Sequence, residues 1–474
     1  MTKQNIERMS LMNIIQDFME NGIKNLFELL GKELKNKGDF SKFVLELKKQ
    51  LDSLGIKICK TALAAADEAI RIEPNGKNQW VVERRDKKTL LTTFGEIKYE
   101  RTYYKSKKDN EYKYLSDEFL GIDCHDRMDL SLKAQLVKEA VDVAYDKSAK
   151  KTIESIDLSS QTVMNTIREL GEIPNITYKD QCQVEESKKT KVKYLYVEAD
   201  EDHVALQNGK SVMPRLVYVH EGYEHSNSKR KKLKNIHYFS GIYNNIEELW
   251  LEVVDYIYNQ YDIDNIENIF VSGDGAAWIK QGISWIPKSV YLLDRFHINK
   301  YILKATTHNH KYRFHIWESI NNCNLKELDK IFKDLIDSTE NENKIQQIKD
   351  SRKYIKSNWE GIVNYYKKSG AINCSAEGHI SHILSDRLSS RPLGWSVQGV
   401  HQVSRLRAYT ANGGAIYELF EKTLKKKKNY FYLSKKVVNS TMKNKCIEKF
   451  NNIESLNTGK KTGLNYLLKA LRGA

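Results

Sequence analysis

The stretch VSGDGAAWIKQGISWIPKSVYLLDRFHINK, residues 271–300, holds two short apolar runs that each lead into an aspartate. The first run, Asn268 to Ser272, ends just before Asp274, and the second, Ser289 to Leu293, ends directly before Asp294. Short apolar runs bounded by turn residues predict buried strands. Because ligands gather at strand ends in open α/β sheets, both aspartates are candidate ligand-binding side chains.

A capping role is the alternative for both aspartates, because each stands where a helix could begin. Gly273 and Gly275 flank Asp274 and let the backbone approach whatever that carboxylate holds, which a cap does not require. The sequence therefore favours a ligand role for Asp274. For Asp294 both interpretations stay open.

The composition predicts a soluble chain of several domains in a reducing cytoplasm. The 474 residues are 40% hydrophobic, and no apolar run approaches the ~20 residues that cross a bilayer. The N-terminus, MTKQNIERMS, lacks the order of a secretory signal. The six cysteines include no CxxC pair, which argues against a zinc knuckle or a disulfide framework. The net charge of +15 favours a polyanionic partner, either nucleic acid or anionic lipid.

The N-terminal region shows first helical and then strand periodicity. Apolar residues from Ile14 to Leu51 recur at helical spacing, which predicts an amphipathic helical hairpin that packs on the chain or on a second copy. From Lys88 to Tyr104 the residues KTLLTTFGEIKYERTYY surround Gly95 and predict a β-hairpin. Its arginine and tyrosines could touch a nucleic-acid backbone, although an ordinary solvated face is the simpler interpretation.

Three helices are expected between Asp129 and Leu170, the last two near Ala149 to Ser155 and Gln161 to Leu170. The turn IDLSS joins these two, and Ser159 or Ser160 can cap the last helix. The expected inward stripe is Val163, Ile167 and Leu170, and the expected outward set is Gln161, Asn165 and Arg168. This is the layout of a helix-turn-helix that reads bases, although similar helix pairs occur in proteins that never touch DNA.

The segment KVKYLYVEADEDHVALQ, Lys191 to Gln207, is the strongest predicted strand. Glu198, Asp200 and Asp202 share one of its faces if the strand stays regular. Carboxylates on one face repel one another unless cations balance them. A metal site therefore explains the three acids better than a structural role.

Further strands and helices follow this acidic strand. Asn208 and Gly209 signal a hairpin into Pro214 to His220, Asn235 to Tyr243 supplies a third strand, and Glu247 to Tyr261 a helix. The two aspartate-ending strands come next, with a helix-sized segment between them. The resulting order, β-β-β-α-β-α-β, predicts an α/β fold with a mixed sheet of the ribonuclease-H-like kind.

Lys-rich and Asn-rich sequence from Tyr301 to Gly370 predicts a helical insertion. The chain then returns to the core with an inward stripe of Ile380, Ile383, Leu384 and Leu388. Glu377 stands at the start of this stripe and is expected to face inward. The residues expected to face outward are His379, His382 and Asp386. Glu377 is either a first-turn acid favoured by the helix dipole or a third acid beside Asp200 and Asp274, and we favour the third acid.

Four segments resemble a known family: VEADEDHVALQ, SGDGAAWIK, LLDRFHINKYI and AEGHISHILSDRLSSRPLGWS. They resemble bacterial insertion-sequence transposases of the Mutator-like superfamily, in a branch long filed as uncharacterised, over about Lys191 to Tyr409. The resemblance implies an acidic triad of Asp200, Asp274 and Glu377. Many relatives have glycine where this chain has Glu201, which puts Asp200 in some competition with Asp202. Asp200 is preferred because it lies nearer the middle of the strand.

The resemblance also implies Mg²⁺-dependent cleavage of element ends and strand transfer into target DNA. Two divalent ions held by carboxylates from separate elements can activate the attacking oxygen and stabilise the leaving one. Mg²⁺ prefers oxygen ligands, so no cysteine or histidine is required, and Mn²⁺ is expected to substitute. His297 is then outside the ligand set, and either orients a phosphate or water or is structural. We expect a homo-oligomer on the DNA, in the cytoplasm with the nucleoid.

Two basic segments complete the expected DNA-facing surface. One is KRKKLK, which includes Lys229, Arg230, Lys231 and Lys232, and the other spans residues 422–436 of the tail. Two rival functions remain. A host nuclease of the same fold would cleave without joining, and a DNA-binding regulator would use the acids only structurally.

The expected division of the chain follows these signals. It has a helical region (1–85), a β-hairpin and helix-turn-helix region (86–180), a first core part (191–300), a helical insertion (301–370), a second core part (371–415) and a basic tail (416–474).

Overall fold

A computed structural model describes residues 18–25, 27–28, 31, 40–72, 79–153, 156–177, 185–224, 232–391 and 394–425. The chain divides into two compact units, one of residues 1–135, 150–158 and 420–474 and the other of residues 136–149 and 159–419. No helix among these described residues is long and apolar enough to cross a bilayer.

The first unit is built on the helix α3 (Phe40–Ile72) and a β-hairpin of β1 (Trp80–Thr92) and β2 (Gly95–Ser106). Thr92 pairs with Gly95 at the turn, so the predicted hairpin is confirmed, and it starts earlier than expected. Leu63 of α3 packs with Leu90 of the hairpin. Shorter elements are η1 (Phe18–Gly22), β3 (Tyr112–Lys113) and α5 (Leu115–Leu120).

The predicted helical hairpin from Ile14 to Leu51 is wrong at its C-terminal end, and most of its first arm lies outside the described residues. The helix continues to Ile72 because its last turns bury Leu63 and Ile70 against the β-hairpin. Tertiary packing of this kind extends a helix beyond the point where its own periodicity weakens.

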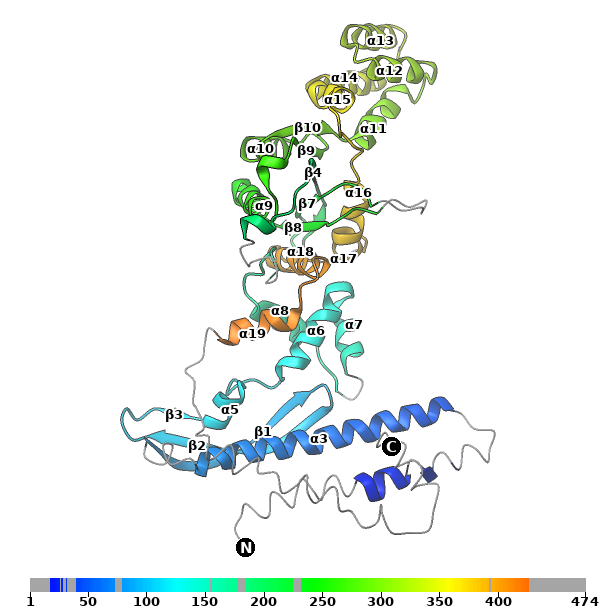
Figure 1. Cartoon of the computed structure of the whole chain (residues 1–474). Coiled ribbons are helices and arrows are strands. Elements are labelled where there is room, and N and C mark those ends of the chain that lie inside the picture. Colours follow the sequence, from blue (N-terminus) through cyan, green and yellow to red (C-terminus); the bar gives the residue numbers. More distant parts are fainter. Residues whose placement is uncertain are drawn as a thin grey trace. The chain divides into compact units, whose positions relative to one another are not determined.

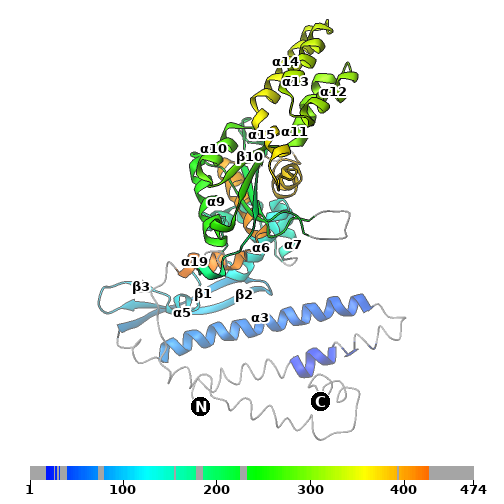
Figure 2. The same cartoon turned by 45° about the horizontal axis from the view of Figure 1, so that its top comes forward.

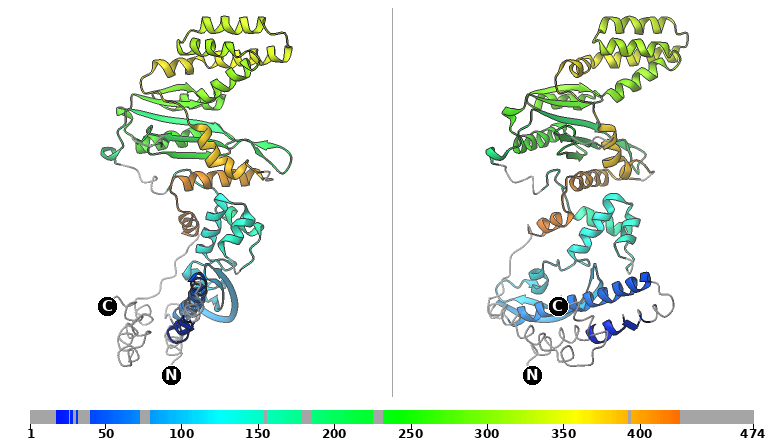
Figure 3. Two further views of the ribbon diagram at one scale, coloured as in Figure 1. Left: turned by 90° about the vertical axis from the view of Figure 1, so that its right-hand side faces the viewer. Right: turned by 45° about the vertical axis from the view of Figure 1, so that its right-hand side comes forward.

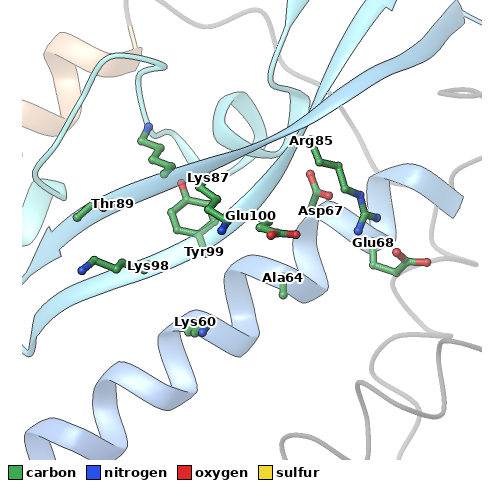
Figure 4. Close-up of a pocket in the computed structure, with 11 residues that line it drawn as sticks. Lys60, Ala64, Asp67, Glu68, Arg85, Lys87, Thr89, Lys98, Tyr99 and Glu100 are labelled. Carbon is green, nitrogen blue, oxygen red and sulfur yellow. The ribbon is translucent and has the colours of Figure 1, made fainter.

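A cluster of buried charged side chains links the β-hairpin to α5. Asp117 is 1% exposed and accepts hydrogen bonds from Lys88 Nζ and Tyr99 Oη, both at 3.1 Å, and it also pairs with Arg101. A hollow of about 630 Å³ lies beside this cluster, between α3 and the hairpin (Figure 4). Basic side chains outnumber acidic ones in its lining, which comprises Lys60, Ala64, Asp67, Glu68, Arg85, Lys87, Lys88, Thr89, Lys98, Tyr99 and Glu100.

A five-stranded mixed sheet forms the centre of the second unit, in the order β10-β9-β4-β7-β8 (Figure 1). Its strands are β4 (Tyr194–Glu201), β7 (Arg215–His220), β8 (His237–Gly241), β9 (Asn268–Gly273) and β10 (Ser289–Leu293). β4, β9 and β10 are parallel, whereas β7 and β8 run antiparallel to their neighbours.

The order of elements along the chain matches the predicted β-β-β-α-β-α-β. The two helices are α9 (Ile246–Gln260), before β9, and α10 (Ala277–Trp285), before β10. A small hairpin of β5 (Val204–Ala205) and β6 (Ser211–Val212) stands between β4 and β7. Two 3-10 turns, η2 (Glu186–Lys188) and η3 (Ile263–Asn265), complete the region.

Helices cover both faces of the sheet (Figure 3). α9 and α10 pack on one face, and the other is covered by α16 (Ala376–Ile380), η4 (Ser381–Ser385), α17 (Asp386–Leu388) and α18 (Val397–Ala411). Alternation along β4 sends Val197 and Ala199 toward α9, and therefore Glu198 and Asp200 toward α16. Asp202 lies beyond the end of β4, so the expected face of three acids holds only for the first two.

Three helices lie between Asp129 and Leu170, as predicted: α6 (Leu130–Asp142), α7 (Tyr145–Thr152) and α8 (Ser160–Glu169). Ser159 Oγ accepts a hydrogen bond from Thr162 N at 3.1 Å, which confirms the predicted cap. The expected inward residues are buried (Val163, Ile167, Leu170) and the expected outward residues are exposed (Gln161, Asn165, Arg168).

The helix before α8 was misplaced, because α7 begins at Tyr145 rather than Ala149. Asp146 in its first turn suits the positive end of the helix dipole, which favours the earlier start. Ser155, the expected end of that helix, lies outside the described residues.

The predicted insertion is helical (Figure 2), and its buried apolar side chains form one cluster with Tyr291 and Leu293 of β10. Its helices are α11 (Arg295–Thr306), α12 (Lys311–Asn321), α13 (Leu325–Asp337), α14 (Glu342–Ser357) and α15 (Trp359–Lys367). α15 lies on β10, where Asn364 Nδ2 donates to Tyr291 O at 3.0 Å. A last described helix, α19, spans Ile416–Lys425.

Candidate active site

Asp200, Asp274 and Glu377 come from three elements that meet at one edge of the sheet. Asp200 lies near the C-terminal end of β4, and Asp274 directly follows the parallel neighbour β9. Because parallel strands end at the same edge, these two aspartates are close. Glu377 lies in α16, which packs against β4. The structure therefore places the three acids at one edge of the sheet, with Asp274 and Glu377 within electrostatic range of Asp200.

Asp200 is the most perturbed of these acids. Burial raises the pKa of Asp200 to about 6, and the negative charges of Asp274 and Glu377 add to the effect. A hydrogen bond from Glu201 N at 2.8 Å and the nearby His297 oppose it. An acid whose pKa is raised in part by neighbouring negative charges favours a bound cation that removes the repulsion.

The turn that carries Asp274 is held tightly by its surroundings. Gly275 has φ +93°, a conformation that side-chain-bearing residues rarely adopt. A side chain on Gly273 would come within 2.7 Å of Ala199 O. From the insertion, Tyr354 Oη donates to Asp274 O at 2.5 Å. The flanking glycines thus serve close packing within the protein, whereas the sequence had assigned them to the approach of the backbone to a ligand.

The capping alternative is right for Asp294 and wrong for Asp274. Asp294 Oδ1 accepts from Phe296 N at 2.9 Å and caps α11. Asp274 Oδ1 accepts from Ala276 N at 2.8 Å, but this closes a local turn, because α10 starts only at Ala277 and has no side-chain cap. Asp274 is therefore not used to begin a helix.

The acids of this region differ in whether their oxygens are already satisfied. Asp294 Oδ2 contacts His297 Nδ1 at 3.2 Å, so both oxygens of Asp294 have partners. Both oxygens of Asp202 also have partners, because they accept from His203 N and Ser389 Oγ, each at 2.8 Å. In this respect Asp202 differs from Asp200, and the sequence had left the choice between these two aspartates open.

At least one oxygen of each of the three central acids lacks such a partner among the described residues. Within the described part of the chain, Oδ2 of Asp200, Oδ2 of Asp274 and the whole Glu377 carboxylate accept no hydrogen bond. Carboxylates that converge without internal partners are suited to an external cation. These three acids, unlike Asp202 and Asp294, each keep an oxygen without a partner among the described residues.

Glu198 is instead a structural anchor. It is 1% exposed and accepts hydrogen bonds from Ser375 N at 2.6 Å and Ser375 Oγ at 3.0 Å, from Tyr218 Oη, and from His220 Nε2 at 3.1 Å. Ser375 immediately precedes α16, so Glu198 joins β4 to the start of the helix that bears Glu377. A metal role for Glu198, which the shared strand face suggested, is not compatible with so many bound donors.

The tautomer of His220 follows from its neighbours. Gly222 N donates to His220 Nδ1 at 3.1 Å, so in the neutral ring Nε2 carries the proton and donates to Glu198. Burial alone would raise the pKa of Glu198, but the donors from His220, Tyr218 and Ser375 outweigh it and lower that pKa. Glu198 is thus held as a carboxylate inside the fold.

The predicted orientation of α16 is wrong in part. Glu377 is exposed and not inward, whereas His379 is half-buried, with its Nδ1 at 2.8 Å from Tyr238 Oη. The segment Ser381–Ser385 is π-helical, with more residues per turn than the α-helical wheel assumes. The buried column therefore recurs every four residues, as Ala376, Ile380, Leu384 and Leu388. His382 and Asp386 are exposed, as predicted.

His297 lies beside the acids, as the sequence suggested. The hydrogen bond to Asp294 raises the pKa of His297 against the opposing effect of burial, and the charges of Asp200 and Asp274 raise it further. The side chain is 15% exposed, so it combines a favoured positive charge with access to the site. This geometry suits a group that holds an anionic oxygen near the acids.

Sequence reasoning missed several residues that shape the site. Glu201 was noted in the sequence only because many relatives have glycine at that position. Its carboxylate lies 3.9 Å from Arg215 Nε, and the Arg215 guanidinium lies 5.2 Å from the centre of the Trp278 ring. Tyr354 and Ser375 hold the site through long-range contacts. The only local signal for Ser375 was its place directly before the helix, where it would have been read as a cap.

The donor set fits Mg²⁺ in chemistry, because it consists of carboxylate oxygens. Among the described residues, no group of three or more His, Cys, Asp or Glu side chains is already arranged to hold a metal ion. The mutual influence on the pKa of Asp200 nevertheless places Asp274 and Glu377 within electrostatic range of it.

The basic segments are only partly described. Lys229, Arg230, Lys231 and residues 426–436 lie outside the described residues. Lys232 is exposed and lies 3.5 Å from Glu224, and Lys234 pairs with Glu221 at 2.7 Å.

The fold and the site define a mixed α/β protein with a cluster of acids at the ends of adjacent parallel strands. Residues 33–427 match the uncharacterised protein family UPF0236, and the chain belongs to this family. A UPF0236 protein of Caldanaerobacter subterraneus subsp. tengcongensis is 43% identical over 462 residues, covering 96% of this chain and 97% of its own length.

Two further relatives widen the comparison. Another UPF0236 protein of the same organism is 42% identical over 471 residues, covering 98% of this chain and 95% of its own, and its name joins eleven locus labels. A UPF0236 protein from Streptococcus gallolyticus, named for the region 3′ of vanSb, is 23% identical over 408 residues, covering 82% of this chain and 87% of its own.

Proposed function

We propose that this chain is a DDE transposase, which binds the ends of an insertion sequence, cleaves DNA and transfers the 3′-hydroxyl strands to a target. The observation that carries the proposal is the convergence of Asp200, Asp274 and Glu377, from three elements, with oxygens that no described residue occupies. A regulator that used these acids only structurally would bind them internally, as Glu198 is bound.

The architecture supports the proposal. β4 is the first strand of the sheet along the chain and lies at its centre, between β9 and β7, with parallel and antiparallel neighbours. This is the strand arrangement we assign to a ribonuclease-H-like core. The resemblance of the four sequence segments to Mutator-like transposases supports the same assignment.

Copy number supports a mobile element. One relative's name joins eleven locus labels and another's joins four, all in one genome. Repeated copies of one gene are what the spread of an insertion sequence leaves behind. A single-copy host nuclease gives no reason for them.

In the proposed mechanism Asp200, Asp274 and Glu377 are the residues that would hold two Mg²⁺ ions. When bound, such ions activate the attacking oxygen and stabilise the leaving 3′-oxygen. His297, whose pKa Asp294 raises, holds a phosphate oxygen beside the acids. Tyr354 holds the turn that carries Asp274, and Glu198 holds the start of α16, which carries Glu377.

Joining is the test that separates a transposase from a nuclease. The purified full-length chain with Mg²⁺ or Mn²⁺ is expected to join a pre-cleaved end, taken from the DNA that flanks its gene, to a target plasmid. Joined product is measured by gel and by sequencing the junctions. Cleavage without any joined product, with both metals and several end lengths, would leave the host nuclease as the better account.

Calcium serves as the matched control for this reaction. Ca²⁺ is larger and coordinates more loosely than Mg²⁺, so it is expected to support DNA binding while the ends stay unreacted. Turnover with Ca²⁺ at the Mg²⁺ rate would contradict a site that depends on tight octahedral geometry.

The exposed polar side chains of α8 are proposed to read DNA. Arg168→Ala is expected to relax the preference for end DNA over random duplex more than it lowers general affinity, because bidentate base contacts carry specificity. The exposed Lys147 on α7 gives the comparison, since Lys147→Ala should lower affinity for all sequences about equally. Binding curves for both DNAs at two salt concentrations measure the difference. An unchanged preference in Arg168→Ala would remove α8 from the interface.

A further inference from the structure

The N-terminal half of α3 has an apolar face that the described residues leave exposed. Its most exposed large apolar side chains are Phe40 (71%), Leu45 (61%), Leu51 (48%), Val44 (45%) and Ile58 (37%). The packing of α3 on the β-hairpin uses other residues, Ile56, Leu63 and Ile70. At 100° per residue, Val44, Leu51 and Ile58 lie about 120° around the helix from those three, on a separate face.

The spacing of this face is that of a coiled coil. Apolar residues alternate by four and three along the helix from Phe40 through Val44, Leu47, Leu51 and Leu54 to Ile58. This places Val44, Leu51 and Ile58 at heptad positions a and Phe40, Leu47 and Leu54 at positions d. The pattern covers about three heptads, roughly the length at which an a/d repeat becomes a meaningful coiled-coil signal. Leu45 falls at position b, outside the seam.

We propose that this face pairs with the same face of a second copy of the chain, as a parallel two-stranded coiled coil in register. Valine or isoleucine at a with leucine at d favours two parallel strands, and here two of the three a positions are β-branched and both inner d positions are leucine. No charged residue stands at an a or d position between Phe40 and Ile58, so the seam buries no charge.

The flanking positions are compatible with this pairing. In a parallel pair, g residues of one helix lie beside e residues of the next heptad in the other. These pairs are Phe43 with Lys48 and Gln50 with Gly55, so no two like charges meet. Lys48 already pairs with Asp52 of its own helix at 3.0 Å.

The area is enough for a specific dimer. The exposed parts of the a and d side chains amount to roughly 400 Å² per copy, and the stems of flanking side chains bring two copies to on the order of 1,200 Å², the lower end of stable interfaces. An apolar strip of this size is rarely left uncovered on a monomer.

The test uses the full-length protein without DNA, so its outcome does not depend on the proposed activity. Sedimentation equilibrium is expected to give a dimer for the unmutated chain. Leu51→Glu should weaken the dimer roughly a hundredfold or more, because two glutamates would face each other in an apolar seam. Leu45→Glu is the matched control, since it adds the same charge at a more exposed leucine outside the seam and should leave the dimer intact.

The orientation is tested separately. Val44→Cys should form a disulfide-linked dimer on mild oxidation, because equivalent a positions lie side by side only in a parallel pair, and the unmutated chain is the control for its own cysteines. A monomeric unmutated protein would overturn the proposal. The apolar face of α3 would then have to be covered by residues 1–39 of the same chain. Equal effects of Leu51→Glu and Leu45→Glu with unchanged helix content, or an intact dimer that does not cross-link at Val44→Cys, would also overturn it.

Discussion

Asp200→Asn, Asp274→Asn and Glu377→Gln are each expected to lower strand cleavage roughly a thousandfold or more while leaving DNA binding largely unchanged. An amide keeps the shape of the side chain and can still accept the local hydrogen bond from Glu201 N or Ala276 N. It removes the negative charge that the ions need. Single-turnover cleavage of labelled end DNA, with binding measured in Ca²⁺, separates the two effects.

Asp202→Asn is the internal control for these variants. Both Asp202 oxygens already have partners, so cleavage should stay within roughly tenfold of the unmutated rate. Cleavage that survives in one of the three central variants would remove that residue from the site. A severe loss in Asp202→Asn would move the first ligand to that position.

Glu198→Ala is expected to destabilise the second unit by about 3–5 kcal/mol, the cost of removing one partner from a buried charged cluster. His220, Tyr218 and Ser375 would keep donors that face an empty space. The free energy of unfolding from urea titrations measures the loss. Glu252→Ala is the comparison, because Glu252 also pairs with a buried arginine, Arg405, at 3.2 Å, but lies away from α16.

Glu198→Gln distinguishes positioning from stability alone. The amide group would have to face the His220 Nε2 proton or the donors of Ser375, so α16 should loosen while the fold survives. We expect faster hydrogen exchange at residues 376–380 and a fall in cleavage, with DNA binding retained. Unchanged exchange and unchanged cleavage would make the cluster purely structural.

Local patterns predicted the strands and turns well. The runs before Asp274 and Asp294 are β9 and β10, and the glycines around Asp274 do sit in a tightly packed turn. The cap at Ser159 and the outward face of α8 were also local signals. Such features depend on a few neighbouring residues, so the sequence is enough to find them.

The features that failed depend on distant residues or on unusual backbone. The prediction for α16 used a helical wheel with about 3.6 residues per turn. The π-helical segment Ser381–Ser385 has more residues per turn, so the buried face differs from the predicted one and Glu377 is exposed. Glu198 looked like a ligand because its partner Ser375 lies 177 residues away. The support of Asp274 by Tyr354 spans 80 residues. Single-sequence periodicity carries no information about contacts of this length.

Because Glu198 and Ser375 lie far apart in the chain, the hydrogen bonds between them can form only late in synthesis. β4 is made early, but its buried carboxylate receives its backbone donor only after the whole insertion has been translated. A gene copy interrupted within the insertion therefore yields a chain that keeps α8 while Glu198 keeps Tyr218 and His220 as donors and lacks those of Ser375. Such a product lacks Glu377 as well, so it is both poorly folded and unable to complete the acidic cluster.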